Sequence, residues 1–400
     1  MEKGLSKNLI TLIEEYKKGN SLYLESEEYI IMPSFCDVHV HFREPGFSYK
    51  ETIYSGSRAS ARGGYTAVCT MPNLNPVPDS VENLKLQLDI IKKDAVIDVY
   101  PYASITKGQK GEELSKMEEL KDLVCAFSDD GRGVQTEKMM ISAMEKAKSL
   151  DKMIVAHCED NSLLFGGYIH KGEYAKAHGH RGICSESEYK QIERDLDLAK
   201  KIGCKYHVCH ISTKESVEVI RKAKKDGVNV TCETGPHYLI LTDANLREDG
   251  NFKMNPPLRS EQDKLALIEG LNDGTIDMIA TDHAPHSQEE KSKGLEKSAF
   301  GIVGIETCFP LVYTYLVEKK LTSLENVIEK MSINPRNRFG FKLDKLDYTI
   351  FKKGNYQILS QEFLSKGKNT PFEKTKVSVK CVLTVRRGEI VYKDEEIDNA

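Results

Sequence analysis

Asp37-Val38-His39-Val40-His41-Phe42-Arg43 is the stretch of this chain that decides its fold and its chemistry. It follows the apolar run 29–35, and residues two apart in a β-strand project to the same side. His39 and His41 are therefore predicted to direct both imidazoles to one point at the end of a buried strand. Two imidazoles so placed make half of a transition-metal site. A His-x-His pair also occurs by chance, so the rest of the chain decides between the two interpretations.

The apolar run that ends in this pair is the first of eight, and amphipathic stretches separate them. Fully apolar strands that alternate with helices predict a parallel sheet buried on both faces. Eight such units predict an α/β fold, a (β/α)8 TIM barrel over residues 31–340, with an open doubly wound sheet as the alternative. The runs are 30–41, 65–73, 95–106, 123–130, 153–159, 206–212, 228–237 and 277–286. The helices predicted between them include 81–92, 138–149, 187–202, 214–225 and 261–271.

The two ends of the chain follow a different pattern. Apolar residues at helical spacing predict a helix over 5–18, whereas 21–29 reads as a short strand. Residues 376–396 alternate apolar and polar side chains around Arg386-Arg387-Gly388, which predicts a hairpin. We therefore expect residues 1–30 and 341–400 to form a small accessory β subdomain whose N-terminal part is reduced and partly helical.

Composition excludes several classes of function. Hydrophobic residues make up 40% and charged residues 30% of the 400, as in an ordinary globular protein. A formal net charge of −4 without a clustered basic face argues against nucleic-acid binding. No apolar stretch approaches the roughly 20 residues of a membrane span, and the charged segment 1–20 does not resemble a secretory signal. Ten cysteines without a Cys-x-x-Cys pair predict reduced thiols and a cytoplasmic protein.

Polar residues at the ends of the predicted strands form a candidate metal centre. Four histidines and two carboxylates exceed what one tetrahedral zinc needs, and they suit two divalent ions that share a bridging carboxylate. A structural zinc is the alternative, but it would be expected to use closely spaced cysteines. Either Asp129 or Asp130 can face the centre, because adjacent strand residues face opposite ways. The strand-end residues are His39, His41, Asp129 or Asp130, His157, His210 and Asp282.

Residues beside these positions have the character of a substrate-binding site. Arg43 lies two residues past His41, and a guanidinium can hold a carboxylate in a bidentate pair. Asn73 and Asn255 could each donate to and accept from a ureide, or serve only in turns. His286 lies four residues beyond Asp282 and could donate to a carboxylate or carbonyl. The polar segment 287–300 that follows it could cover the site.

Several motifs of the chain together resemble the dihydroorotase family of the amidohydrolase superfamily, in the class whose binuclear zinc site is bridged by aspartate. The resemblance covers roughly residues 30–340. The motifs that carry it are His39-Val40-His41-Phe42-Arg43-Glu44-Pro45-Gly46, Met71-Pro72-Asn73, Ser128-Asp129-Asp130-Gly131 and Ala280-Thr281-Asp282-His283-Ala284-Pro285-His286.

This resemblance implies a role for each matching residue. His39 and His41 would bind one zinc, His157 and His210 the other, and Asp130 would bridge the two. Asp282 would bind the first zinc and shuttle the proton. The residues implied to bind substrate are His41, Arg43, Asn73, Asn255 and His286, with Phe300 and Gly301 closing over the ring.

The activity implied is the zinc-dependent, reversible cyclisation of N-carbamoyl-L-aspartate to L-dihydroorotate, a step in pyrimidine (UMP) biosynthesis. Opening one cyclic amide requires a nucleophile generated from water, polarisation of the carbonyl and an acid for the leaving nitrogen. Asp282 can serve as base and then as acid. The family also implies a homodimer and an association with aspartate transcarbamoylase as partners to be tested.

One departure from the wider superfamily separates this chain from its enzymatic rivals. Related hydantoinases and the other dihydroorotase class bridge their metals with a carboxylated lysine on the fourth strand. Segment 123–130 holds no lysine, which also argues against an allantoinase or a dihydropyrimidinase. Either an aspartate bridges or the site holds one metal. A rival of another class is a non-catalytic, dihydroorotase-like scaffold subunit, which would be expected to have lost metal ligands.

Overall fold

Strand β3 (Phe35–Val40) carries the first predicted ligands and is buried along its whole length. The computed structural model describes residues 5–395 and 397. Residues 1–4, 396 and 398–400, at the outer ends of the predicted accessory subdomain, lie outside the described residues. The predicted run 30–41 is not one strand. Strand β2 (Tyr29–Pro33) ends before Ser34 and joins a different sheet from β3, so the predicted boundary at residue 30 falls inside β2.

The turn between β2 and β3 has a clear physical cause. The Ser34 amide donates to Asp347 O at 3.2 Å. At this residue the chain leaves the sheet that contains β2 and enters the sheet that contains β3. Arg336, buried in helix α15 (Asn334–Phe339), donates to the Ser34 carbonyl at 2.8 Å and to the Phe35 carbonyl at 3.1 Å. The backbone groups freed by the change of sheet are thereby satisfied.

All eight predicted runs are linked to a neighbour on both sides. Strands β3–β4–β5 and β6–β9–β10–β11 pair in parallel in these two orders. The run 123–130 forms no regular strand, but Phe127 bridges Ala103 on one side and Ile154 on the other. Val40 of β3 bridges His283, just beyond β11. The remaining bounds are β4 (Tyr65–Thr70), β5 (Asp98–Pro101), β6 (Met153–Ala156), β9 (Lys205–Val208), β10 (Val230–Thr234) and β11 (Met278–Ile279).

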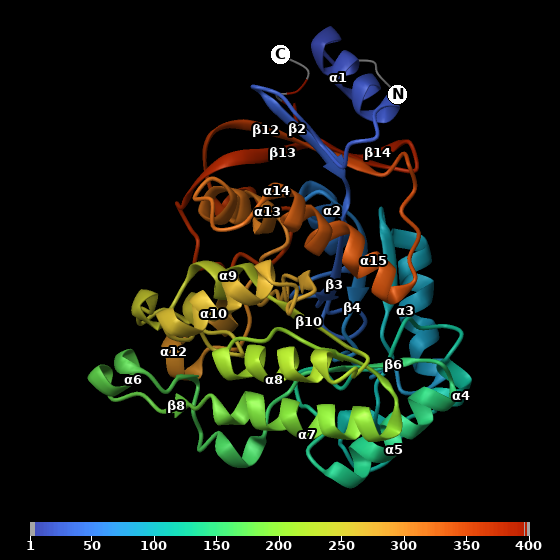
Figure 1. Cartoon of the computed structure of the whole chain (residues 1–400), viewed down its shortest axis with the longest axis vertical. Coiled ribbons are helices and arrows are strands. Elements are labelled where there is room, and N and C mark those ends of the chain that lie inside the picture. The colour runs from blue at the N-terminus through green and yellow to red at the C-terminus, as the bar shows by residue number, and fades with distance from the viewer. Residues whose placement is uncertain (1–4, 396, 398–400) are drawn as a thin grey trace.

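Helices separate the parallel strands near the predicted positions (Figure 1). Most begin at a serine or threonine whose side chain accepts a backbone N–H of the first turn, as Thr136, Thr213 and Ser260 do. These helices are α2 (Ile53–Arg62), α3 (Val81–Asp94), α5 (Glu137–Ser149), α7 (Glu186–Ile202), α8 (Lys214–Lys225) and α10 (Glu261–Asn272). Shorter helices are α4 (Met117–Leu120), α6 (Glu173–His178), α9 (Pro236–Ile240), α11 (Gln288–Lys291), α12 (Gly294–Lys297), α13 (Cys308–Val312) and α14 (Leu324–Ile328).

Segments from both ends of the chain share one five-stranded sheet, which lies at the upper end of the molecule in Figure 1. Helix α1 (Lys7–Lys18) packs on it, and Leu9 and Ile13 join one apolar cluster with Tyr29 and Tyr348. The hairpin turn has positive φ at Arg387 and Gly388. In sheet order the strands are β1 (Leu24–Glu25), β2, β12 (Tyr348–Gln357), β13 (Lys376–Arg386) and β14 (Glu389–Lys393).

Two further features bear on the sequence predictions. Strands β7 (Ile169–His170) and β8 (Gly182–Ile183) form a small excursion that the apolar pattern did not predict, because each has only two residues. All ten cysteines are free thiols, eight of them buried. Among the described residues, no helix is both long enough and apolar enough to cross a membrane.

We expect Arg336→Met to lower the free energy of unfolding by about 3 kcal/mol, because the Phe35 carbonyl would lose the guanidinium donor and the Ser34 carbonyl would keep the Ser332 hydroxyl but lose the guanidinium. Denaturant-induced unfolding measures the change. Arg58→Met, at an exposed position of α2, is the matched control and should change stability by less than about 0.5 kcal/mol. Equal stabilities of the two variants would contradict this role of Arg336.

Candidate metal centre

A buried carboxylate joins the two segments that carry the outermost predicted ligands. Asp37 accepts the Thr281 hydroxyl at 2.6 Å and the His39 amide at 3.0 Å. The His41 amide donates to His283 O at 2.8 Å. Burial raises the pKa of Asp37 to about 7, although the Thr281 hydroxyl and the His39 amide oppose that shift. The end of β3 and the segment after β11 are thereby held against each other.

Asp130 lies at the centre of the predicted histidines. Its carboxylate oxygens are 3.4 Å from His39 Nε2 and 3.5 Å from His41 Nε2. They are also 3.7 Å from His157 Nδ1 and 3.5 Å from His210 Nε2. His157 Nδ1 and His210 Nε2 are 2.9 Å apart. One buried carboxylate thus contacts imidazoles that come from three different strand ends.

Asp282 contacts the first two histidines. Its Oδ1 is 3.4 Å from His39 Nε2 and 3.0 Å from His41 Nε2. The backbone at this edge of the sheet is strained, with φ values of 59° at Arg43, 31° at His210 and 47° at Asp282. Such conformations are costly for residues other than glycine and gather at functional sites.

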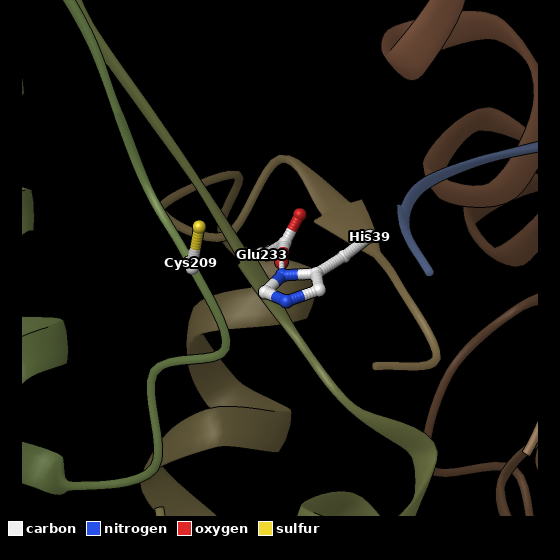
Figure 2. A group of neighbouring side chains, drawn as sticks. All are labelled: His39, Cys209 and Glu233. Atoms are coloured by element: carbon white, nitrogen blue, oxygen red, sulfur yellow. Dashed lines mark hydrogen bonds and ion pairs between the residues drawn. The ribbon is translucent and has the colours of Figure 1, made fainter. Parts of the chain in front are cut away.

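Outer hydrogen bonds decide which imidazole nitrogen faces this cluster. His39 Nδ1 lies 2.6 Å from Glu233 Oε1, and His41 Nδ1 lies 2.9 Å from Asn73 Oδ1. Figure 2 shows the Glu233 carboxylate beside the His39 ring, with Cys209 near it. Because these oxygens only accept, each Nδ1 donates, and Nε2 is the ring nitrogen that faces the carboxylates.

The inward-facing atoms fit a divalent metal. His39 Nε2 and Asp130 Oδ1 are buried and have no hydrogen-bond partner among the described residues. Two ligands about 2.0–2.1 Å from a tetrahedral zinc lie about 3.3 Å apart, and the N–O separations around His39 are 3.4 Å. Imidazole nitrogens with carboxylate oxygens are also a donor set that zinc accepts.

The charges of the cluster call for a cation at its centre. Burial alone would lower the pKa of His39, but Asp130, Glu233 and Asp282 hold it well above its usual value. Burial alone would raise the pKa of Asp130, but the histidines, His39 first, hold it well below its usual value. The carboxylates are therefore ionised, and a proton or a metal ion must balance them.

Asp129 faces away from the cluster. Its Oδ1 accepts the amides of Ile105 at 2.8 Å and Thr106 at 3.1 Å, and its other oxygen accepts the Thr106 hydroxyl. Asp129 therefore fixes the loop after β5, whereas Asp130 faces the histidines. Strand alternation alone left this choice open.

Two carboxylates behind the histidines were missed by the sequence analysis. Glu233 accepts from His39 and lies 3.0 Å from His207 Nε2. Glu159 Oε2 lies 3.6 Å from His157 Nε2, and its other oxygen accepts the Asn255 side-chain amide at 2.9 Å. A charged residue inside the apolar run 228–237 was the available signal for Glu233, and the spacing of two residues from His157 was the available signal for Glu159.

Arg43 and His286 meet at one edge of the cluster. Arg43 Nε donates to Pro285 O at 3.2 Å, and its Nη2 lies 3.3 Å from His286 Nε2. Among the described residues, no carboxylate forms an ion pair with this buried guanidinium. Burial, Arg43 and Lys50 lower the pKa of His286 to about 3, so its imidazole is neutral. This edge therefore suits an anionic ligand.

The other predicted substrate-binding residues lie near this edge or beside a predicted metal-ligating histidine. Asn73 contacts His41 and Asn255 contacts Glu159, so each is held beside a predicted metal ligand. His286 Nε2 donates to Phe300 O at 2.8 Å, which brings Phe300 and Gly301 to the same place. The segment 287–300 is not plain loop, since it contains α11 and α12.

Known proteins resemble this chain over most of its length. A family model described as dihydro-orotase-like matches residues 28–216. A dihydroorotase of Fusobacterium nucleatum is 53% identical over 92% of this chain and 88% of its own length. One from Bacillus subtilis is 49% identical, covering 94% and 90%. Among solved structures, the L-hydantoinase from Arthrobacter aurescens has a TM-score of 0.81 at 25% identity, covering 91% of this chain and 85% of its own.

We expect Glu233→Gln to weaken zinc binding by about 10- to 100-fold, because a neutral amide oxygen is a weaker acceptor for His39 Nδ1 than the carboxylate is. Competition with a chelator of known affinity measures the change without relying on turnover. Glu193→Gln, at an exposed position of α7, is the control and should bind zinc as the unaltered protein does. Unchanged zinc affinity in the Glu233 variant would show that His39 needs no such support.

Proposed function

The chain belongs to the dihydroorotase family, and we propose that the cluster around Asp130 is its active site. The protein is a cyclic-amide hydrolase that interconverts N-carbamoyl-L-aspartate and L-dihydroorotate. The observation that supports this site is the single buried carboxylate of Asp130, which lies within 3.7 Å of four imidazole nitrogens.

The ligand set suits two zinc ions per chain. In our proposal His39, His41 and Asp282 would hold one ion, His157 and His210 would hold the other, and Asp130 would contribute to both. When bound, the ions would supply the Lewis acidity that polarises the amide carbonyl and makes water a nucleophile near neutral pH. The outer contacts of Glu233 and Asn73 keep two of the imidazoles in the tautomer that such binding requires.

Asp282 is the proposed proton carrier. Burial alone would raise the pKa of Asp282, but His39 and His41 hold it below its usual value, so the carboxylate is ionised at neutral pH. It can accept the proton released when water attacks the amide and deliver that proton to the leaving ring nitrogen. In the direction of ring closure, the same carboxylate takes the proton from the ureide nitrogen.

Arg43 is the proposed anchor for the substrate carboxylate. It is buried and has no carboxylate partner among the described residues, so a substrate carboxylate would balance its charge. His286, neutral and 3.3 Å away, can share that anion as a donor if its bond to Phe300 opens. Dihydroorotate carries such a carboxylate, whereas simpler ring ureides such as dihydrouracil lack it.

We also propose a domain organisation for the whole chain. The eight linked runs form a closed (β/α)8 barrel, and the five-stranded sheet from the two chain ends is the accessory subdomain. The hydantoinase likeness supports this fold. A cytoplasmic location, a homodimer and an association with aspartate transcarbamoylase stay predictions.

We expect the purified protein to close N-carbamoyl-L-aspartate at mildly acidic pH and to open L-dihydroorotate at alkaline pH, with about two zinc ions per chain. Asp282→Asn should lower kcat by roughly 10²-fold or more, the scale of a lost general acid–base. Rates and bound metal are measured on the same samples. Hydrolysis of hydantoin but not of dihydroorotate would overturn the substrate assignment, and full activity in the variant would overturn the role of Asp282.

Arg43→Met should abolish selection for the carboxylate. We expect kcat/KM for dihydroorotate to fall by about 10²-fold, since a charge-assisted bidentate contact is lost from a buried site. The rate with dihydrouracil, already low, should change by less than about 3-fold, since this contact is never made with it. Equal losses on both substrates would mean that Arg43 serves only the structure of the site.

A further inference from the structure

Lys291, at the end of α11, is a buried cation that the proposed mechanism does not use. Only 5% of its surface is exposed. Its Nζ donates to the carbonyls of Lys253 at 3.0 Å, Ala299 at 2.8 Å and Gly301 at 2.7 Å. Three acceptors match the three N–H groups of an ammonium. Among the described residues, no carboxylate forms an ion pair with this side chain.

These contacts tie together segments that are far apart along the chain. Lys253 follows β10 and α9, whereas Ala299 and Gly301 end the segment after β11. The Gly301 amide also donates to Lys253 O at 3.1 Å, so that carbonyl serves both Gly301 and the ammonium. The ammonium therefore fixes the backbone of residues 299–301.

A second buried side chain reaches the same glycine. Asn369 Nδ2 donates to Gly301 O and to Ala284 O, each at 3.1 Å. Its Oδ1 accepts the His286 amide at 3.1 Å. Gly301 O thus receives Lys291 and Asn369 together, and Asn369 comes from the part of the chain predicted to be accessory.

The backbone held in this way lies against the proposed carboxylate site. His286 donates to Phe300 O at 2.8 Å. Gly301 has φ of 128°, and a Cβ there would lie 2.7 Å from Ala284 Cβ and 3.2 Å from His286 Nε2. Only glycine permits so close an approach. A shift of residues 300–301 would therefore move His286, which faces Arg43.

We propose that Lys291 is a positioning residue whose ammonium holds the Phe300–Gly301 backbone in the conformation that binds the substrate. The inference rests on the proposed function and on the family resemblance, which implies that these two residues close over the substrate ring. Lys291 does not touch the reacting atoms or the metal ligands. Its loss should therefore weaken substrate binding and leave zinc binding intact.

Binding is best measured where no turnover occurs. Titration calorimetry of N-carbamoyl-L-aspartate into zinc-loaded Asp282→Asn protein gives Kd in an inactive background. It should be run at pH 6, because burial lowers the pKa of Lys291 to about 7 and the ammonium form must dominate. Adding Lys291→Met is expected to raise Kd by about 10- to 100-fold, the cost of misplaced binding groups, with the zinc content unchanged.

Matched variants separate positioning from general stability. Lys297→Met removes an exposed lysine from the same segment and should leave Kd unchanged. In otherwise unaltered enzyme, Lys291→Met should raise KM for dihydroorotate more than it lowers kcat. If Lys291→Met fails to fold, Asn369→Ala tests the same Gly301 carbonyl and should raise Kd in the same direction.

The outcomes also separate this inference from the proposed function. If the Asp282→Asn protein binds zinc but no N-carbamoyl-L-aspartate, the proposed substrate site is wrong. If it binds the substrate, and Lys291→Met or Asn369→Ala binds it equally well, only the positioning role is overturned. Loss of zinc from Lys291→Met would likewise overturn it, because the residue would then support the metal centre itself.

Discussion

The site depends on one unfavourable arrangement, the burial of Asp130 among four imidazoles. A buried carboxylate without a counter-charge is costly, and here His39 and His41 use Nδ1 for outer hydrogen bonds, so that Nε2 of each ring faces the carboxylates. A cation at the centre satisfies the carboxylates and the imidazoles at once. The remaining features of the site keep this arrangement from relaxing.

Two layers of hydrogen bonds hold Asp130 and the histidines in this arrangement. Behind the imidazoles, Glu233 and Asn73 accept from His39 and His41 and so fix both rings. Around them, Asp37 fastens the end of β3 to the segment after β11 through Thr281. The positive φ values at Arg43, His210 and Asp282 are strain that this framework holds in place.

The substrate side of the site is built from cations rather than carboxylates. Arg43, Lys50 and Lys291 all act on His286 and help keep its imidazole neutral. Arg43 and Lys291 are both buried, and each is held by backbone carbonyls. The Arg43 guanidinium has one carbonyl acceptor and no ion-paired carboxylate among the described residues, whereas the Lys291 ammonium donates all three N–H groups to backbone carbonyls. In our proposals the two cations therefore differ in role: Arg43 binds the ligand, and Lys291 positions the backbone beside it.

The sequence by itself determined the residues whose roles follow from local pattern. Alternation placed His39 and His41 on one side of a strand, and the repeat of apolar runs placed His157, His210 and Asp282 at equivalent strand ends.

Alternation could not choose between Asp129 and Asp130, because the face that each strand residue occupies is set by the neighbouring strands. The run 30–41 also looked continuous, although Ser34 divides it between two sheets. The contacts of Glu233, Glu159, Lys291 and Asn369 depend on the tertiary structure, since each of these side chains has a partner on a segment distant in sequence. His39 and Glu233 are separated by 194 residues, and Asn369 and Ala284 by 85. Local periodicity reports which face a side chain occupies, whereas the partner it meets there depends on how distant segments come together.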